Sequence, residues 1–153
     1  MKTFVYSILI TLLVFSFSKL DAQDFKTDDI LGKWITEEGE SVVQIFKKEN
    51  KYYGKLIWLK EPNDENGKVK TDNKNPNEKL QKRKIKGLIF MYSFEFDDGE
   101  WENGKVYDPK KGKTYSGTLK LRTKDIMDLR GYIGISLIGR TSTWVRYKKK
   151  KEN

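Results

Sequence analysis

The chain has 153 residues, and 31 lysines and arginines against 22 aspartates and glutamates give it a formal net charge of +9 at pH 7. It contains neither histidine nor cysteine, which excludes His-dependent triads, zinc fingers, Cys-ligated clusters and disulfide frameworks. This length favours a single domain whose core needs no disulfide.

The N-terminus has the pattern of a signal peptide. A short basic start at Met1 and Lys2 precedes an apolar run over residues 4–17 and a polar segment that ends at Ala22. At about 1.5 Å per residue this run is too short to cross a hydrocarbon core of roughly 30 Å. We therefore expect cleavage of residues 1–22 and export to the periplasm or the medium. No cysteine follows the run, so a lipoprotein anchor is not expected.

The excess positive charge lies in one segment and one tail. Residues 60–86 hold nine basic and five acidic side chains, and the C-terminal tail, 148–153, holds four and one. Outside that segment, the domain over residues 23–147 is nearly neutral, which argues against a nucleic-acid-binding face. The charge supports at most a weak electrostatic contact with an acidic envelope surface, and it leaves the oligomeric state open.

The body of the chain alternates with the period of β-strands. Turn signals separate the strands, notably Asp97-Asp98-Gly99, and Asn103-Gly104 predicts a further tight hairpin. The expected strands are residues 33–37, 42–47, 52–59, 88–96, 105–107, 113–122, 126–133 and 141–147.

About eight strands joined by short turns predict an all-β fold, an antiparallel up-and-down barrel. Closure of the barrel removes the two exposed edges that an open meander would have. A barrel of this size either fills its interior with side chains or holds one small ligand. A partly open sheet is the alternative, and residues 77–86, which lack Pro and Gly, could form a short helix in the 61–86 loop.

The first strand opens with Gly32-Lys33-Trp34, which resembles the Gly-x-Trp start of lipocalin-like barrels. The resemblance implies that Trp34 closes one barrel end beneath a basic side chain of the last strand. Arg146 is the first candidate for that side chain and Arg140 the second, with Trp144 as a neighbouring core residue. A guanidinium suits this place because it stacks on indole while its donors bind carbonyl groups.

A second resemblance covers residues 32–146. The stretches that carry it are residues 32–34; Asp72, Asn75-Pro76, Leu80, Arg83 and Gly87; residues 104–109 and 112–115; residues 129–134; and residues 137–140 and 143–146. In these stretches the chain resembles the uncharacterised exported bacterial family called domain of unknown function 2147. The resemblance implies a signal peptide and a small calycin-type barrel, and it implies no established activity.

The densest motif is Tyr107-Asp108-Pro109 followed by Gly112-Lys113-Thr114-Tyr115. A functional interpretation places Tyr107, Asp108 and Tyr115 at a barrel mouth, where they could orient a polar ligand group. A structural interpretation explains the same residues as a hairpin turn, with Gly112 in the left-handed region. Trp58 could line a ligand cavity or belong to the ordinary core.

Arg130 and Tyr132 share one face of the strand over residues 126–133. If that face points inward, Arg130 becomes a polar anchor for a carboxylate or phosphate group. If it points outward, Arg130 is a cross-strand partner on the surface. The sequence does not decide between the two.

The longest irregular stretch contains Asp72, Asn75 and Arg83, and we expect these residues to brace a loop folded over one barrel end. The acidic residues of this stretch do not follow a calcium-loop pattern, and lysines are mixed among them. We expect no metal and no cofactor.

These observations favour a non-catalytic barrel that binds a small apolar or amphipathic molecule in the cell envelope. A packed barrel that contacts an envelope polymer or protein is the first alternative. An enzyme that uses carboxylates or tyrosines is the second, although no motif singles out a pair of acids.

Overall fold

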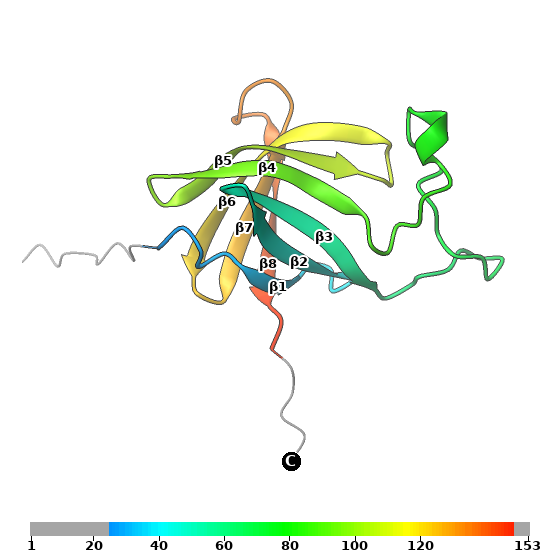
Figure 1. Ribbon diagram of the computed structural model, residues 1–153, viewed down its shortest axis with the longest axis horizontal. Coiled ribbons are helices and arrows are strands. Elements are labelled where there is room, and N and C mark those ends of the chain that lie inside the picture. Colours follow the sequence, from blue (N-terminus) through cyan, green and yellow to red (C-terminus); the bar gives the residue numbers. More distant parts are fainter. Residues whose placement is uncertain (1–24, 149–153) are drawn as a thin grey trace, which may run out of the picture.

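The computed structural model describes residues 25–148, so the predicted signal peptide and most of the basic tail lie outside the described residues. Within them, eight antiparallel strands form a closed barrel in the order β1 to β8 (Figure 1). The strands are β1 (Gly32–Ile35), β2 (Ser41–Lys48), β3 (Lys51–Leu59), β4 (Ile89–Asp97), β5 (Glu100–Asp108), β6 (Lys113–Thr123), β7 (Ile126–Tyr132) and β8 (Gly139–Arg146).

The barrel closes where β1 pairs with β8, and Trp34 stands opposite Arg146. The predicted eight-stranded up-and-down barrel is therefore confirmed. In the loop between β3 and β4, the described residues form one 3-10 turn, η1 (Glu78–Leu80), in place of a longer helix over residues 77–86. No helix in the described range is long and apolar enough to cross a membrane.

The prediction of a tight hairpin at Asn103-Gly104 is wrong. Asn103 does adopt a positive φ of 58°, but it forms a bulge inside β5, where the pairing with β6 shifts between Trp101 and Gly104. The bulge places Gly104 against the ring of Phe94, where a Cβ atom would overlap the ring. The positive φ therefore belongs to a bulge that packs against the neighbouring strand β4, and the chain turns earlier, between β4 and β5.

Large side chains fill the barrel interior. Trp34, Phe94, Trp101, Leu119 and Met127 are all 0% exposed. A close-packed core of this kind has little free volume.

Gly104 on β5 and Gly117 on β6 make room for the ring of Phe94. A Cβ at Gly117 would lie 3.0 Å from Cζ of Phe94 and 2.8 Å from Cγ2 of Val106. Gly131 is paired with Gly117 on the next strand and differs from it: the nearest atom to its Cβ position, Cβ of Tyr115, is 3.9 Å away.

Arg146 covers one end of the barrel. Its guanidinium carbon lies 4.2 Å from the centre of the Trp34 ring. The guanidinium donates to the carbonyl oxygens of Leu31 (2.8 Å), Asp29 (2.7 Å) and Lys124 (2.6 Å). Burial lowers the pKa of Arg146, yet an arginine remains charged at any ordinary pH.

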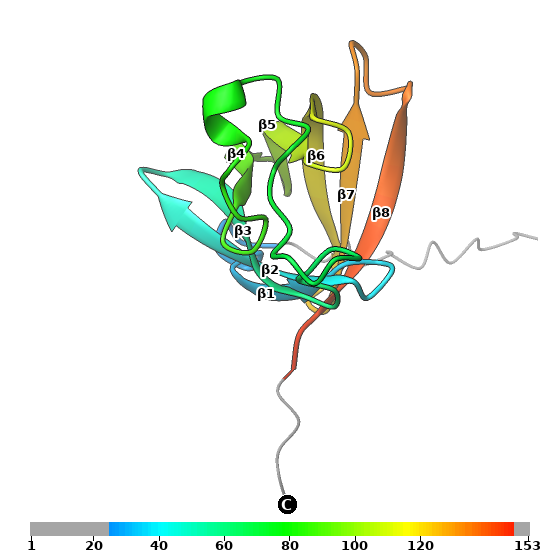
Figure 2. The ribbon, with the colours of Figure 1, turned by 90° about the vertical axis from the view of Figure 1, so that its right-hand side faces the viewer.

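We call the barrel end that Arg146 covers the closed end. The four connections β1–β2, β3–β4, β5–β6 and β7–β8 lie at the opposite, open end. The long β3–β4 loop and the β7–β8 loop project from the molecule there (Figures 1 and 2).

Candidate functional site

The β3–β4 loop, residues 60–88, folds back along the barrel wall. Gly87 N donates to Leu56 O (2.6 Å), and Leu56 N donates to Leu88 O (2.9 Å). Inside the loop, Ile85 N donates to Lys70 O (3.1 Å). These backbone bonds fix the returning arm of the loop beside β3.

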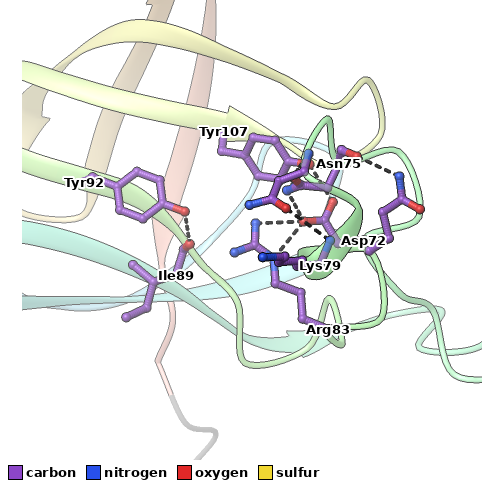
Figure 3. A network of polar contacts seen from close by, with 9 residues as sticks. Asp72, Asn75, Lys79, Arg83, Ile89, Tyr92 and Tyr107 are labelled. Atoms are coloured by element: carbon purple, nitrogen blue, oxygen red, sulfur yellow. Dashed lines mark hydrogen bonds and ion pairs between the residues drawn. The ribbon is translucent and has the colours of Figure 1, made fainter.

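A buried carboxylate holds the tip of the same loop (Figure 3). Asp72 is 0% exposed, and its carboxylate accepts hydrogen bonds from Tyr107 Oη (2.6 Å) and from Asn75 Nδ2 (2.8 Å). Arg83 donates to it through Nε (2.8 Å) and forms an ion pair through Nη2 (2.7 Å). Burial and the bond to Asp72 raise the pKa of Tyr107, so its hydroxyl stays protonated and donates.

The β5–β6 turn packs against this loop. Asp108 accepts a hydrogen bond from Lys110 N (2.9 Å) through its side chain, and its carbonyl accepts one from Gly112 N (2.8 Å). Gly112 has a φ of +67°, and a Cβ there would overlap the carbonyl of Lys74 in the long loop. Gly112 therefore serves both the turn and the contact between the two connections.

Two adjoining hollows lie between the returning arm of the loop and the strands beside it. They are shallow and largely open to solvent, and their volumes are about 540 and 550 Å³. We call them together the loop groove. Lys84, Lys86 and Gly87 line both hollows. The first is completed by Lys55, Leu56, Ile57, Pro62 and Val69, and the second by Arg83, Leu88, Ile89 and Tyr92.

The loop groove is apolar and cationic. Among the described residues, Lys55, Lys84 and Lys86 form no ion pair, and no carboxylate lines either hollow. Tyr92 lies at one side, where burial raises the pKa of its phenol, and it donates a hydrogen bond to Ile89 O. An anionic head with an apolar body matches this lining.

Arg130 lies on the outer face of β7, because the neighbouring Met127 and Leu129 are the buried, inward residues of this strand. Its donors hold the β7–β8 loop: Nε binds Ser136 O (2.7 Å), and Nη1 binds Thr141 Oγ1 (3.0 Å). The outward alternative is the one that the structure adopts, and Arg130 is not an anchor inside the barrel.

The other residues considered for ligand binding are spread over the open end. Tyr132 shares the outer face with Arg130, and Tyr115 is half-buried near Gly131. Tyr107 points into the Asp72 network, and Trp58, at the end of β3, is 45% exposed. The structure does not bring these side chains into one site.

The two remaining candidates for barrel closure have neighbours other than the Trp34 ring. Trp144 is buried 6.4 Å from Phe90, ring centre to ring centre, and its indole nitrogen donates to Ser142 Oγ. Arg140 stands at the start of β8, 3.6 Å from Glu38. Of the two arginines, it is Arg146 that stacks on Trp34.

Within residues 25–148 no group of three or more acidic side chains lies close enough together to hold a metal ion. The loop groove was missed from the sequence. The alternation Lys84-Ile85-Lys86 gives a faint signal of it, since it places the two lysines on one side of the chain and Ile85 on the other. The path of the loop depends on contacts that the sequence does not display.

The fold and the Arg146–Trp34 closure define a lipocalin-like barrel. Its sequence matches over residues 32–146 a family model described as an uncharacterised protein conserved in bacteria, DUF2147. The chain belongs to this family.

A solved structure of Helicobacter pylori protein HP1028, described as belonging to the lipocalin family, is similar to the chain, with a TM-score of 0.69 and 26% sequence identity. The match covers 79% of this chain and 84% of that one. No curated protein matches the sequence.

Proposed function

We propose that the protein is an exported, non-catalytic barrel that binds a small anionic amphiphile in the loop groove. The observation that carries this proposal is the lining of the two hollows, which share Lys84 and Lys86 and include no carboxylate. The apolar side chains, such as Val69 and Ile57, would cover the body of the ligand, and the ammonium groups would bind its head.

The groove is preferred to the barrel interior because side chains such as Phe94 and Trp101 already fill the interior. The same packing favours the second candidate, a packed barrel that contacts a partner through its surface. The two functions differ in whether a small molecule saturates a site on the isolated protein.

The test is a titration with laurate, measured by calorimetry, of the wild type and of a Lys84→Gln, Lys86→Gln double variant. Loss of two ammonium groups from the groove should weaken laurate binding by roughly tenfold and reduce its salt dependence. The matched control, Lys79→Gln with Lys82→Gln, removes the same charge from exposed positions of the same loop. It should change the affinity by less than about twofold.

A third variant separates the groove from the barrel interior. Gly131→Leu places a side chain in the space beside Tyr115, at the open end. If the lysine pair leaves laurate binding intact and Gly131→Leu abolishes it, the ligand enters the barrel and the groove proposal is wrong. If laurate does not bind at all, the groove proposal is also wrong, and the second candidate, a packed barrel that contacts a partner through its surface, replaces it.

Export is part of the same proposal and has its own test. The residues that suggest it, 1–22, form a basic start, an apolar run and a small residue at Ala22. Protein expressed with its natural N-terminus should be recovered from the periplasm or medium with Gln23 as its first residue. An intact Met1 in a cytoplasmic fraction would contradict export.

A further inference from the structure

The β7–β8 loop projects at the open end of the barrel (Figure 2). It exposes large aliphatic side chains. The exposed fractions are 67% for Ile133, 60% for Ile135, 85% for Leu137 and 70% for Ile138. Single exposed aliphatic residues are ordinary on protein surfaces, but four within six consecutive residues are not. We call residues 133–138 the aliphatic tip.

The aliphatic tip is held in shape by its own hairpin. Arg130 binds the carbonyl oxygens of Ser136 (2.7 Å) and Leu137 (3.3 Å), and Ile138 N donates to Ile135 O (3.2 Å). These bonds satisfy backbone groups that would otherwise lose water on entering an apolar phase. The tip is therefore ordered before it meets a partner, which reduces the entropy lost on binding.

The nearest charged residues along the chain on either side of the tip are positive. Arg130 and Arg140 flank it, and residues 131–139 between them contain no charged side chain. Arg140 lies 3.6 Å from Glu38 in a pair that is mostly exposed, and it therefore remains available to other anions. Aliphatic side chains at a protruding tip, with cationic groups at its base, complement a lipid surface with anionic headgroups.

We infer that the aliphatic tip inserts into the outer layer of an anionic lipid bilayer and docks the open end of the barrel on it. A protein partner fits less well, because four side chains on a six-residue loop cannot supply the roughly 800 Å² that each partner buries in a stable interface. A bilayer needs only the tip itself. The inference does not depend on ligand binding in the loop groove.

The test uses vesicles of equal parts phosphatidylcholine and phosphatidylglycerol, with bound protein measured by co-sedimentation. The variant Leu137→Asp with Ile138→Asp should lower the partition coefficient at least tenfold, because each aliphatic side chain moved from water into hydrocarbon strengthens partitioning by about tenfold. Val145→Asp, at an exposed position of β8 beside Arg146 at the closed end, is the control and should bind within about twofold of the wild type. All variants are otherwise identical in sequence, so any contribution of other segments to vesicle binding is the same in each.

A local readout is available because the chain contains no cysteine. An environment-sensitive dye attached to Leu137→Cys should shift to the blue when vesicles are added. The same dye on Lys48→Cys, at the end of β2 away from the open end, should not shift.

Three results would overturn the inference: a wild type that does not bind the vesicles, an aspartate variant that binds them as the wild type does, or a dye at position 137 that does not respond. A concentration-dependent dimer in gel filtration that disappears in Leu137→Asp, Ile138→Asp would instead assign the tip to a second copy of the chain.

Discussion

The ion pair between Arg83 and Asp72 should be the strongest single brace of the β3–β4 loop. Replacing Arg83 with methionine keeps most of the side-chain volume but leaves a fully buried carboxylate without its cation. Breaking a buried pair in this way costs about 3–5 kcal/mol. The Arg83 side chain is 31% exposed, so water can partly replace it, and we expect a loss of about 2–4 kcal/mol.

The assay is thermal and urea unfolding of Arg83→Met, Asp72→Asn and the double variant. For a domain of this size, a loss of about 2–4 kcal/mol lowers Tm by roughly 8–16 °C. Because the two groups touch, the double-mutant cycle should give a coupling energy of at least about 1.5 kcal/mol. Lys120→Met breaks the exposed pair with Glu100 and should cost less than about 1 kcal/mol.

Limited proteolysis supplies an independent readout of the same brace. The loop carries nine basic residues between positions 60 and 86, so trypsin should cut it faster in Arg83→Met while the strands resist. The reasoning is refuted if Arg83→Met costs less than about 1 kcal/mol, or if the two single changes are additive. Either result would mean that Tyr107 and Asn75 hold Asp72 without the ion pair.

Two further outcomes follow from the closed end. Arg146→Lys should lower the free energy of unfolding by about 2–3 kcal/mol in urea denaturation, because one ammonium group cannot stack on Trp34 and also reach three carbonyl oxygens; a loss below about 0.5 kcal/mol would contradict the assigned role. Hydrogen bonds from Lys47 and Tyr52 lower the pKa of Asp28 in the folded protein, so its contribution is present at neutral pH and is lost as the pH falls through the folded pKa. The Tm difference between wild type and Asp28→Asn should therefore shrink as the pH falls below about 4, and a difference that is constant with pH would refute the linkage.

The barrel could be predicted because its evidence is local. Alternation along β6, as in Leu119-Lys120-Leu121, and turn signals such as Asp97-Asp98-Gly99 are readable within a few residues. Closure follows from the need to cover two sheet edges. The turn signal at Asn103 was misleading because a positive φ occurs in a bulge as well as in a hairpin. Only the contact of the next residue, Gly104, with Phe94 on the neighbouring strand decides between them.

The orientation of Arg130 could not be predicted for a related reason. Both faces of β7 carry apolar side chains, with Ile126 and Tyr132 on one and Met127 and Leu129 on the other. Alternation gives the two faces but not which of them is inside. The buried partners on neighbouring strands, such as Trp144 opposite Met127, settle that choice.

The loop groove depends on contacts between distant parts of the chain. Its returning arm is positioned by Arg83 on Asp72, eleven residues earlier, and the loop is also held by Gly112 against Lys74. Both contacts are made by residues of loops and turns, so no periodic pattern in the sequence predicts them. The sequence identified Asp72, Asn75 and Arg83 as a brace, but it could not show what surface that brace builds.

Arginine and lysine have different roles in this protein, which contains no cysteine or histidine: arginines hold both ends of the barrel in place, and lysines line the loop groove. Arg146, Arg83 and Arg130 each make several bonds to carbonyl or carboxylate oxygens, and they fix the closed end, the β3–β4 loop and the aliphatic tip. A planar guanidinium suits this role because its donors are rigid and weakly hydrated. Lys84 and Lys86 line the groove, and neither forms an ion pair among the described residues, so a mobile point charge is available to follow a ligand head. Arginine-to-lysine changes should therefore damage the scaffold, and lysine-to-glutamine changes should damage binding.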